Sequence, residues 1–539
     1  MTPISFRATS SVLLAALGLL AACGGGGDGG SPAAPPDTLA PTISSVSPAA
    51  SSAGNGAGPV DVVFSEPVKC SSLVADSLTV SDGATVIPGL TTCSGNALSF
   101  VPATALPTAA TLTGTVRTSV TDLAGNALGA PMNWQFKTAA WTQQLGTDRI
   151  DAGQAVAIDA LGNIYVAGAT EGSVDGQASA GSFDVLLVKF DRFGVKQWSR
   201  QFGTPASDSA YALAIDAAGN VFVGGGTDGD LDANAGNNAT DGFIAKFDGA
   251  GTRLWTRQLH SSQPDLVRAL AVDPAGNVIA TGYTLGALFG GGIRGPDIMV
   301  AKYDSAGTLL WGRQLGTTSA DVAGGVVTDA AGNVYLGGYT GGDLATGGSA
   351  TTGPDVVLIK LDSAGATQWV RQIAEASSDF GSALAIDAGG HLYLAGRTDG
   401  TLGGTNAGDL DALLMKFDSS DGSLLWARQV GSPAADHAFG VATDVSGNVA
   451  ITGYTLGGLD GLASAGNYDG FVVKYDSAGT KLWSRQFGSA AVDQAYGLAF
   501  DADGNVFIAG TTGGSLDGRP NAGADDLMLV KYGPDGSAR

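Results

Sequence analysis

Apolar and polar residues alternate in short runs along most of the chain, and turn-forming residues interrupt these runs at close intervals. Such runs of about four to eight residues predict β-strands, and the Gly, Asn, Asp and Pro between them predict tight turns. Between residues 41 and 139 the runs TISSVSP, VDVVFSEPV, SLTV, ALSFVPA, TLTGTV and MNWQFKT follow this pattern. This part predicts an antiparallel β-sandwich.

From residue 140 to 539 the strand pattern repeats. Tryptophan marks the period at steps of 56 to 58 residues, at Trp141, Trp198, Trp255, Trp311, Trp369, Trp426 and Trp483. Each repeat has four runs, as in GVATD, GNVAITG, DGFVVKYD and TKLWSRQ, with tight turns Asp-x-x-Gly-Asn and Asp-Ser-Ala-Gly between the first and last pairs. Seven four-stranded antiparallel units predict a seven-bladed β-propeller, so the fold class is all-β.

The ends of the repeat region predict how the ring closes. The last repeat stops at Ser537 without a Leu-Trp-x-Arg-Gln strand, whereas the first begins with the strand 141–145 and has no blade before it. We expect this N-terminal strand to complete the last blade, because both ends would otherwise leave unpaired strand edges.

Composition and charge narrow the function classes. The chain has 539 residues, too many for one core, with 84 glycines and only 14% charged residues. Its net charge of −23 repels phosphates, so we expect no nucleic acid partner and no electrostatic attraction to anionic lipids.

The N-terminus predicts export. Arg7 precedes the apolar run 12–22, which is too short to span a bilayer, and Cys23 follows it. The sequence Leu20-Ala21-Ala22-Cys23 resembles a bacterial lipobox. That resemblance implies a lipoprotein signal peptide over 1–22 and a lipid on Cys23. The alternative is an ordinary signal peptide with an incidental cysteine. Residues 23–40, rich in Gly, Pro and Ser, predict a flexible tether.

The other two cysteines, Cys70 and Cys93, would face an oxidising compartment in an exported protein. We expect a disulfide between them that contributes about 3 kcal/mol of stability. The alternative is two free buried thiols.

Two family resemblances support the domain division. The motifs FSEPV at 64–68, SFVP at 99–102, TDLAGN at 121–126 and WQFKT at 134–138 resemble the bacterial Ig-like domain of surface proteins, which implies a spacer or adhesion module. The repeats resemble the SBBP β-propeller family in the core Asp-x-x-Gly-Asn-Val-Tyr-Val-Ala-Gly. This second resemblance implies architecture rather than an activity.

An aspartate recurs ten residues after each tryptophan, on the side of the ring where the long loops after strands two and four are expected. These residues are Asp151, Asp208, Asp265, Asp321, Asp379, Asp436 and Asp493. One hypothesis is an acidic ring at the channel mouth that binds a cation such as Ca²⁺. The alternative is a structural role, in which each pairs with the arginine two residues after a tryptophan or caps a turn.

Other repeated residues predict architecture. The third-strand lysines are expected to form buried or half-buried ion pairs with neighbouring aspartates, and the tryptophans to pack between blades. The lysines are Lys189, Lys246, Lys302, Lys360, Lys416, Lys474 and Lys531.

Candidate catalytic residues are few. His260, His391 and His437 occupy different repeat positions and are expected to be ordinary surface or turn residues. The segment Asp304 to Trp311 is similar to the Asp-box of sialidases and to the tryptophan motif of quinoprotein propellers, but no arginine triad or quinone site matches. We therefore predict no catalytic residue and no cofactor.

The sequence predicts a lipid-anchored cell-envelope protein, bound to the outer membrane by analogy from Gly24, that presents a propeller face to a glycan, a protein or a cation without catalysis. One alternative is an envelope enzyme, a quinoprotein-like oxidoreductase or a polysaccharide hydrolase or lyase, which would use the non-repeating Arg294, Glu375 and His437. A third hypothesis is an outer-membrane assembly scaffold, against which the 57-residue period argues.

Overall fold

The computed structural model describes residues 37–48, 53–54, 59–103, 106, 110–138, 141–231, 239–290, 295–345, 353–373 and 377–539. Its regular elements are β-strands and short 3-10 helices, and none of its helices is long and apolar enough to cross a membrane. Cys23, the signal peptide and the tether up to residue 36 lie outside the described residues, as do Arg294 and Glu375.

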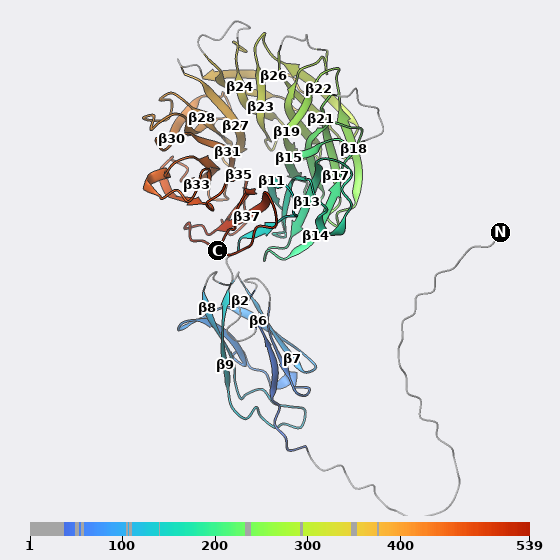
Figure 1. The fold of residues 1–539 in the computed structure, drawn as a ribbon, viewed down its shortest axis with the longest axis vertical. Coiled ribbons are helices and arrows are strands. Elements are labelled where there is room, and N and C mark those ends of the chain that lie inside the picture. Colours follow the sequence, from blue (N-terminus) through green and yellow to red (C-terminus); the bar gives the residue numbers. More distant parts are fainter. Residues whose placement is uncertain are drawn as a thin grey trace, which may run out of the picture.

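The N-terminal part is the predicted Ig-like β-sandwich (Figure 1). One sheet contains β1 (Ile43–Ser47), β3 (Val60–Phe64), β7 (Ala97–Pro102) and β6 (Gly89–Ser94). The other contains β2 (Ala53–Gly54), β9 (Met132–Thr138), β8 (Thr111–Val116), β4 (Leu78–Asp82) and β5 (Thr85–Val86). Alternate side chains such as Val62, Leu98 and Leu112 are fully buried between the sheets.

The predicted disulfide is present. Cys70, in the 3-10 helix η1 (Cys70–Ser72), bonds to Cys93 of β6, with their Cα atoms 5.6 Å apart. The bond links the crossover between the two sheets to a strand of the first sheet.

Residues 141–539 form seven four-stranded blades, as predicted (Figure 1). Blade 1 consists of β11 (Asp151–Ile158), β12 (Ile164–Thr170), β13 (Asp184–Phe190) and β14 (Lys196–Phe202), and blade 2 of β15 (Asp208–Ile215), β16 (Val221–Thr227), β17 (Asp241–Phe247) and β18 (Arg253–Leu259). Blade 3 consists of β19 (Asp265–Val272), β20 (Val278–Thr284), β21 (Asp297–Tyr303) and β22 (Leu309–Leu315), and blade 4 of β23 (Asp321–Thr328), β24 (Val334–Thr340), β25 (Asp355–Leu361) and β26 (Thr367–Ile373). Blade 5 consists of β27 (Asp379–Ile386), β28 (His391–Thr398), β29 (Asp411–Asp418) and β30 (Leu424–Val430), and blade 6 of β31 (Asp436–Thr443), β32 (Val449–Thr455), β33 (Asp469–Tyr475) and β34 (Lys481–Phe487). Two further 3-10 helices, η2 (Val174–Gly176) and η3 (Leu459–Gly461), follow the second strands of blades 1 and 6.

Blade 7 combines both ends of the repeat region. It contains β35 (Asp493–Phe500), β36 (Val506–Thr512), β37 (Asp526–Tyr532) and, as its outer strand, β10 (Gln143–Leu145). Strand β10 pairs antiparallel with β37, and the Trp141 N–H donates to the Arg539 carbonyl at 2.6 Å. The predicted closure by the N-terminal strand is confirmed.

The short turns fold as their sequences indicate. Oδ1 of Asp159 accepts from the N–H groups of Leu161 and Asn163, and Gly162 takes a positive φ of 81°. Asp304 caps the turn between strands three and four of blade 3 in the same way, with Gly307 at φ 82°. Glycine takes this left-handed conformation without steric cost. These turns share one face of the ring.

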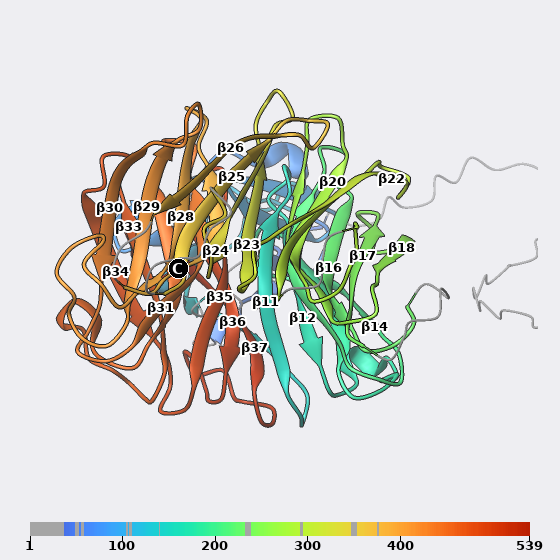
Figure 2. The same cartoon turned by 90° about the horizontal axis from the view of Figure 1, so that it is seen from above.

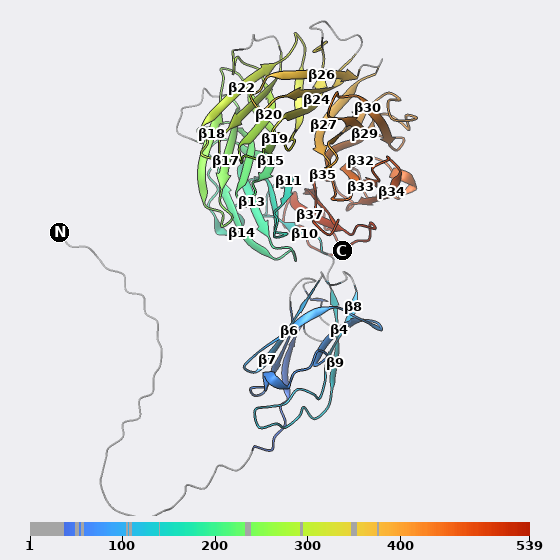
Figure 3. The same ribbon diagram turned by 180° about the vertical axis from the view of Figure 1, so that it is seen from behind.

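The first strand of each blade lies next to the centre of the ring, as Figures 1 and 3 show from opposite sides. Figure 2 shows the ring at 90° to these views. Each first strand begins, and each second strand ends, at the face opposite the short turns. We call this the long-loop face, and residues early in the first strands lie at its channel mouth.

Candidate functional site

The seven repeated aspartates that begin the first strands are fully buried. Six of them accept from the backbone N–H four residues earlier at 2.5 to 2.6 Å, a contact made by Thr147, Thr204, Ser261, Thr317, Ser432 and Ser489, and Asp379 accepts from the hydroxyl of Ser377. Burial raises the pKa of Asp208, and hydrogen bonds from Thr227 and Thr204 act against that rise. These aspartates therefore cap turns inside the blades.

The other structural role, pairing with the arginine two residues after a tryptophan, was a wrong prediction for the described residues. Arg200, for example, donates to the Gly251 carbonyl at 2.7 Å in the following blade, as do its counterparts in other blades. Uptake of Ca²⁺ by the ring stays a prediction, which a shift of the thermal unfolding midpoint with Ca²⁺ against chelator would test.

A second set of buried aspartates, not identified from the sequence, begins the third strands. Each accepts a hydrogen bond of 2.7 to 2.8 Å from the glutamine three residues after a tryptophan. Gln144 makes this contact to Asp526 across the ring closure. The Trp-x-Arg-Gln signature therefore joins strand four to strand three within each blade.

The third-strand lysines divide into two groups. Lys246, Lys302, Lys474 and Lys531 form the predicted ion pairs with the turn aspartate of their own blade. In blades 1, 4 and 5 that aspartate instead accepts from a tyrosine hydroxyl, from Tyr165, Tyr335 and Tyr393. The residue three positions after the turn Gly therefore decides whether a lysine or a tyrosine hydroxyl satisfies the buried carboxylate.

The tryptophans pack between blades, as predicted. The indole N–H of Trp255 donates to the Ser305 carbonyl at 3.2 Å, in the strand 3–4 turn of the next blade. Trp311 and Trp483 make the matching contacts to Ser363 and Pro534. The repeated aspartates, lysines and tryptophans thus stabilise the blades and their packing. A ligand site is therefore expected among residues that differ between blades.

Such residues occur at a β-bulge in every first strand. The ladder to the second strand skips one residue, three positions after the aspartate, between small neighbours such as Ala438 and Gly440. A bulge re-aims the side chain of its extra residue. The seven bulge residues are Gln154, Tyr211, Arg268, Gly324, Ser382, Phe439 and Tyr496.

All seven bulge residues line one central cavity of about 420 Å³. Aliphatic residues two positions further along, among them Val156, Leu270 and Val441, form its deeper wall. This volume suits a small ligand or a short segment of a polymer. Arg268 is the charged residue among those that line the cavity.

Aromatic side chains continue from this cavity over blades 4 to 7. Ring centroids are 4.9 Å apart for Tyr339 and Phe380, 3.9 Å for His437 and Phe439, and 5.3 Å for Phe439 and Tyr496. The guanidinium of Arg397 lies 4.3 Å from the centre of the Phe380 ring and connects that ring to His437. We call this set the aromatic arc: Tyr339, Phe380, Arg397, His437, Phe439, Tyr454, Tyr468 and Tyr496.

The opposite side of the mouth carries small side chains. The positions that hold Phe380 and Arg397 in blade 5, or His437 and Tyr454 in blade 6, hold Ala152 and Ala169 in blade 1 and Ser209 and Gly226 in blade 2. The mouth is therefore asymmetric, with an aromatic wall facing an open side.

The sequence comparisons agree with this architecture. Residues 37–138 match the bacterial Ig-like domain family, and residues 140–173, 197–232, 310–345 and 482–517 match the SBBP β-propeller repeat. The chain is a bacterial Ig-like domain followed by SBBP β-propeller repeats.

Two curated relatives resemble the Ig-like and SBBP chain over part of their length. The uncharacterized WD repeat-containing protein L264 of Acanthamoeba polyphaga mimivirus is 22% identical over 502 residues, with 69% of this chain and 36% of the relative covered. Regulatory protein FlaEY of Caulobacter vibrioides is 27% identical over 414 residues, with 66% and 42% covered. The chain spans less than half the length of either relative.

Solved structures match the SBBP propeller at low scores. The Pan2 WD40 domain of Neurospora crassa has a TM-score of 0.41 at 11% identity and covers 72% of this chain and 95% of its own. The gluconolactonase XC5397 of Xanthomonas campestris has a TM-score of 0.29 at 16% identity and covers 54% and 82%. Neither match carries an argument about function.

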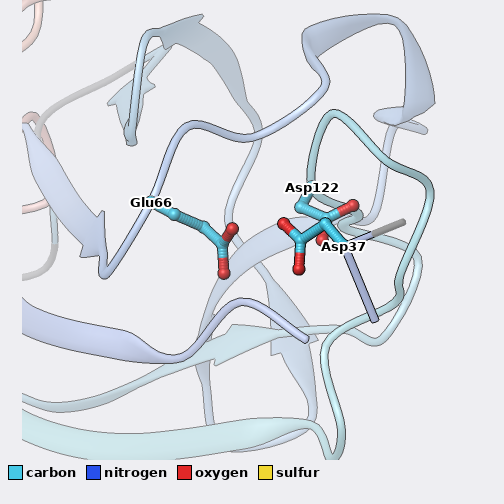
Figure 4. Close-up of side chains that lie close together, drawn as sticks. All are labelled: Asp37, Glu66 and Asp122. Atoms are coloured by element: carbon cyan, nitrogen blue, oxygen red, sulfur yellow. The ribbon is translucent and has the colours of Figure 1, made fainter. Parts of the chain in front are cut away.

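The Ig-like domain holds one cluster of acids. Carboxylate oxygens of Asp37, Glu66 and Asp122 lie within 4.8 Å of one another (Figure 4). Loss of solvent and then repulsion from the two aspartates raise the pKa of Glu66. The oxygens of Asp122 already accept from Gly125 and Asn126 of their own turn, and we assign no metal to this cluster.

The histidine prediction holds for two of the three residues. His260 is exposed, and His391 replaces the turn Asn and contacts Asp387 at 3.0 Å. For His437 the prediction was wrong, because its side chain is buried at the junction of blades 5 and 6. The variable position next to a repeated Asp was the available signal, since aromatic residues occur there in two successive blades.

The buried side chain of His437 is expected to make the stability of the protein depend on pH. Burial, and then the charge of Arg397, lower its pKa from 6.5 to about 3, so it is neutral near pH 7. Between pH 6.5 and 3 the unfolded chain binds a proton that the folded chain excludes, so stability falls on acidification. Relative to His437→Gln, the wild type is expected to lose about 1 kcal/mol of unfolding free energy per pH unit in that window.

Urea denaturation at successive pH values measures this difference. The substitution His260→Gln, at an exposed histidine, is the control for general acid effects. Parallel pH curves for the wild type and His437→Gln would contradict a buried neutral imidazole.

Proposed function

We propose that this protein is a lipid-anchored, non-catalytic binding protein of the cell envelope, whose propeller binds a glycan at the long-loop mouth of its central channel. The lipobox-like sequence ending at Cys23 supports the anchor, and the Ig-like domain fits a spacer between membrane and propeller. The aromatic arc is the observation that best supports a glycan as the ligand.

Flat apolar faces with polar tips are what a sugar ring requires, since its own faces are apolar and its edges carry hydroxyls. Phe439 and Tyr496 offer half-buried ring faces at the cavity wall. Gln154 and Ser382 supply neutral polar groups around the same cavity. The residues that line it include no carboxylate pair of the kind that glycosidases use, which favours binding over hydrolysis.

The purified full chain is expected to bind oligosaccharides on a glycan array, with affinities then measured by calorimetry. Replacing Phe439 or Tyr496 by alanine should weaken binding roughly 10-fold or more, because both rings would form the centre of the contact. Phe193→Ala, in a short turn on the opposite face, should leave affinity unchanged. Thermal unfolding of each variant verifies folding.

Uniformly negative arrays would overturn the proposal and favour a protein partner or the assembly-scaffold hypothesis. Cleavage or oxidation of a bound glycan would replace it by the envelope-enzyme hypothesis.

A further inference from the structure

Two arginines occur beside the central cavity and in the aromatic arc. The chain carries a net charge of −23, yet Arg268, the bulge residue of blade 3, lines the cavity, and Arg397, in the second strand of blade 5, lies against Phe380 and His437 of the aromatic arc. Neither takes part in any ion pair among the described residues. Both are stacked on aromatic rings instead, Arg268 at 5.7 Å from the Tyr283 centroid and Arg397 at 4.3 Å from that of Phe380.

The surroundings of Arg397 leave its charge uncompensated. Its Nη1 donates to His437, 3.0 Å from Nδ1, and that imidazole is neutral because burial and Arg397 itself lower its pKa. Its Nε is buried without a hydrogen-bond partner in the described part of the chain. A guanidinium always carries its charge, and a partly buried charge without a counter-charge is costly.

His437 also limits where the guanidinium can point. It accepts from Arg397 on one side and contacts Ser382 Oγ at 3.2 Å on the other. Ser382 and Phe439, both in contact with His437, line the cavity, as does Arg268. Arg268 thus lines the cavity itself, and Arg397 is connected to its wall through His437.

We propose that the ligand of this site is an acidic oligosaccharide, whose uronic acid carboxylates are bound by Arg397 and by Arg268 while its sugar rings stack on the aromatic arc. This inference rests on the proposed glycan-binding function and narrows it. A guanidinium presents parallel N–H donors that match the two oxygens of a carboxylate, and each charge-assisted bond is stronger than a neutral one. The buried aspartates of the frame do not compete, because they are hydrogen-bonded inside the blades.

The test compares acidic oligosaccharides with their carboxyl-reduced counterparts, which keep the sugar rings and lose the charge. Suitable probes are hexasaccharides of galacturonate, of mannuronate with guluronate, and of glucuronate alternating with N-acetylhexosamine. Calorimetry with the full chain is expected to show at least one acidic probe bound, with roughly 10- to 100-fold weaker binding of its reduced form.

Variants locate the contact. Arg397→Gln and Arg268→Gln should each weaken binding of the acidic probe roughly 10-fold or more and leave that of the reduced form unchanged. Arg397→Lys keeps the charge without the planar fork and should bind between the wild type and Arg397→Gln. Arg192→Gln, on the opposite face, makes the same change in net charge and should bind like the wild type.

The outcomes separate the two proposals. If acidic and reduced probes bind equally, the glycan site stands and the acidic ligand is wrong. If no probe of either kind binds, and neutral glycans also fail, both proposals fall. If binding prefers the acidic probe but ignores both arginine substitutions, the site lies elsewhere and this inference is overturned.

Discussion

Replacing Lys474 by methionine is expected to destabilise the propeller by about 3 to 5 kcal/mol. Its Nζ lies 2.9 Å from Asp444 Oδ2, and both side chains are almost fully buried. Burial pushes the pKa of Asp444 upward, but hydrogen bonds from Asn448 and Lys474 keep it below its ordinary value. Removing the ammonium leaves a buried carboxylate without its counter-charge.

Urea denaturation at pH 7 measures this loss. The same substitution at Lys189 is the matched control, because Asp159 in that blade accepts from Tyr165 and lies outside the lysine ion pairs. Lys189→Met is expected to cost only about 1 kcal/mol, the value of its hydrogen bond to Gly249. Equal losses at the two sites would show that the ion pair is not the cause.

The repeat also offers a rescue. Ala450 occupies the position of Tyr165 in its own blade, so Ala450→Tyr in the Lys474→Met background should restore part of the lost stability through a hydroxyl donated to Asp444. The cost of Lys474→Met should also shrink as the pH falls below 3.8. A carboxyl group whose pKa is lowered on folding loses its stabilising contribution when it is protonated.

Replacing Trp141 by alanine is expected to cost about 3 to 5 kcal/mol and to loosen the ring at its closure. The side chain is 3% exposed and packs edge-on against Phe507, with centroids 5.1 Å apart. Its indole also contacts Gly194 in the turn of blade 1. The void left by the indole would therefore lie next to β10, the outer strand of blade 7. This strand is not continuous in sequence with β37 and is held to it by hydrogen bonds.

Denaturation together with limited proteolysis checks this prediction. Trp198→Ala is the comparison, because Trp198 holds the same repeat position in a blade whose four strands are continuous in sequence and is more exposed. It should cost less and should not raise cleavage between residues 513 and 539. Early cleavage there in both variants would contradict a special role for the closing strand.

The blade architecture could be predicted from the sequence because the same strand and turn pattern occurs seven times. The tryptophan period fixed the number of blades, and the missing last strand indicated the closure by β10. The turn aspartates and Gly162 were recognisable from local chemistry, since their hydrogen bonds span only two to four residues.

The proposed ligand site at the channel mouth could not be predicted in the same way. Phe380, Arg397 and His437 meet across a blade junction, and their separations in sequence carry no local signal. Because the seven aspartates recur in every repeat, the sequence suggested them as a site, but their side chains are buried within the blades. The signal of the bulge in the sequence is a variable position three residues after each aspartate, which small residues flank in most blades, as Ala438 and Gly440 do in blade 6.

The bulge has a consequence for how this protein can change over time. A residue that stands outside the ladder can be exchanged without altering the register of its neighbours, so its identity is nearly independent of the stability of the blade. Seven such positions surround one mouth. If the repeats arose by duplication of one blade, each copy could keep the same fold while a different side chain at its bulge contributed to a shared binding surface.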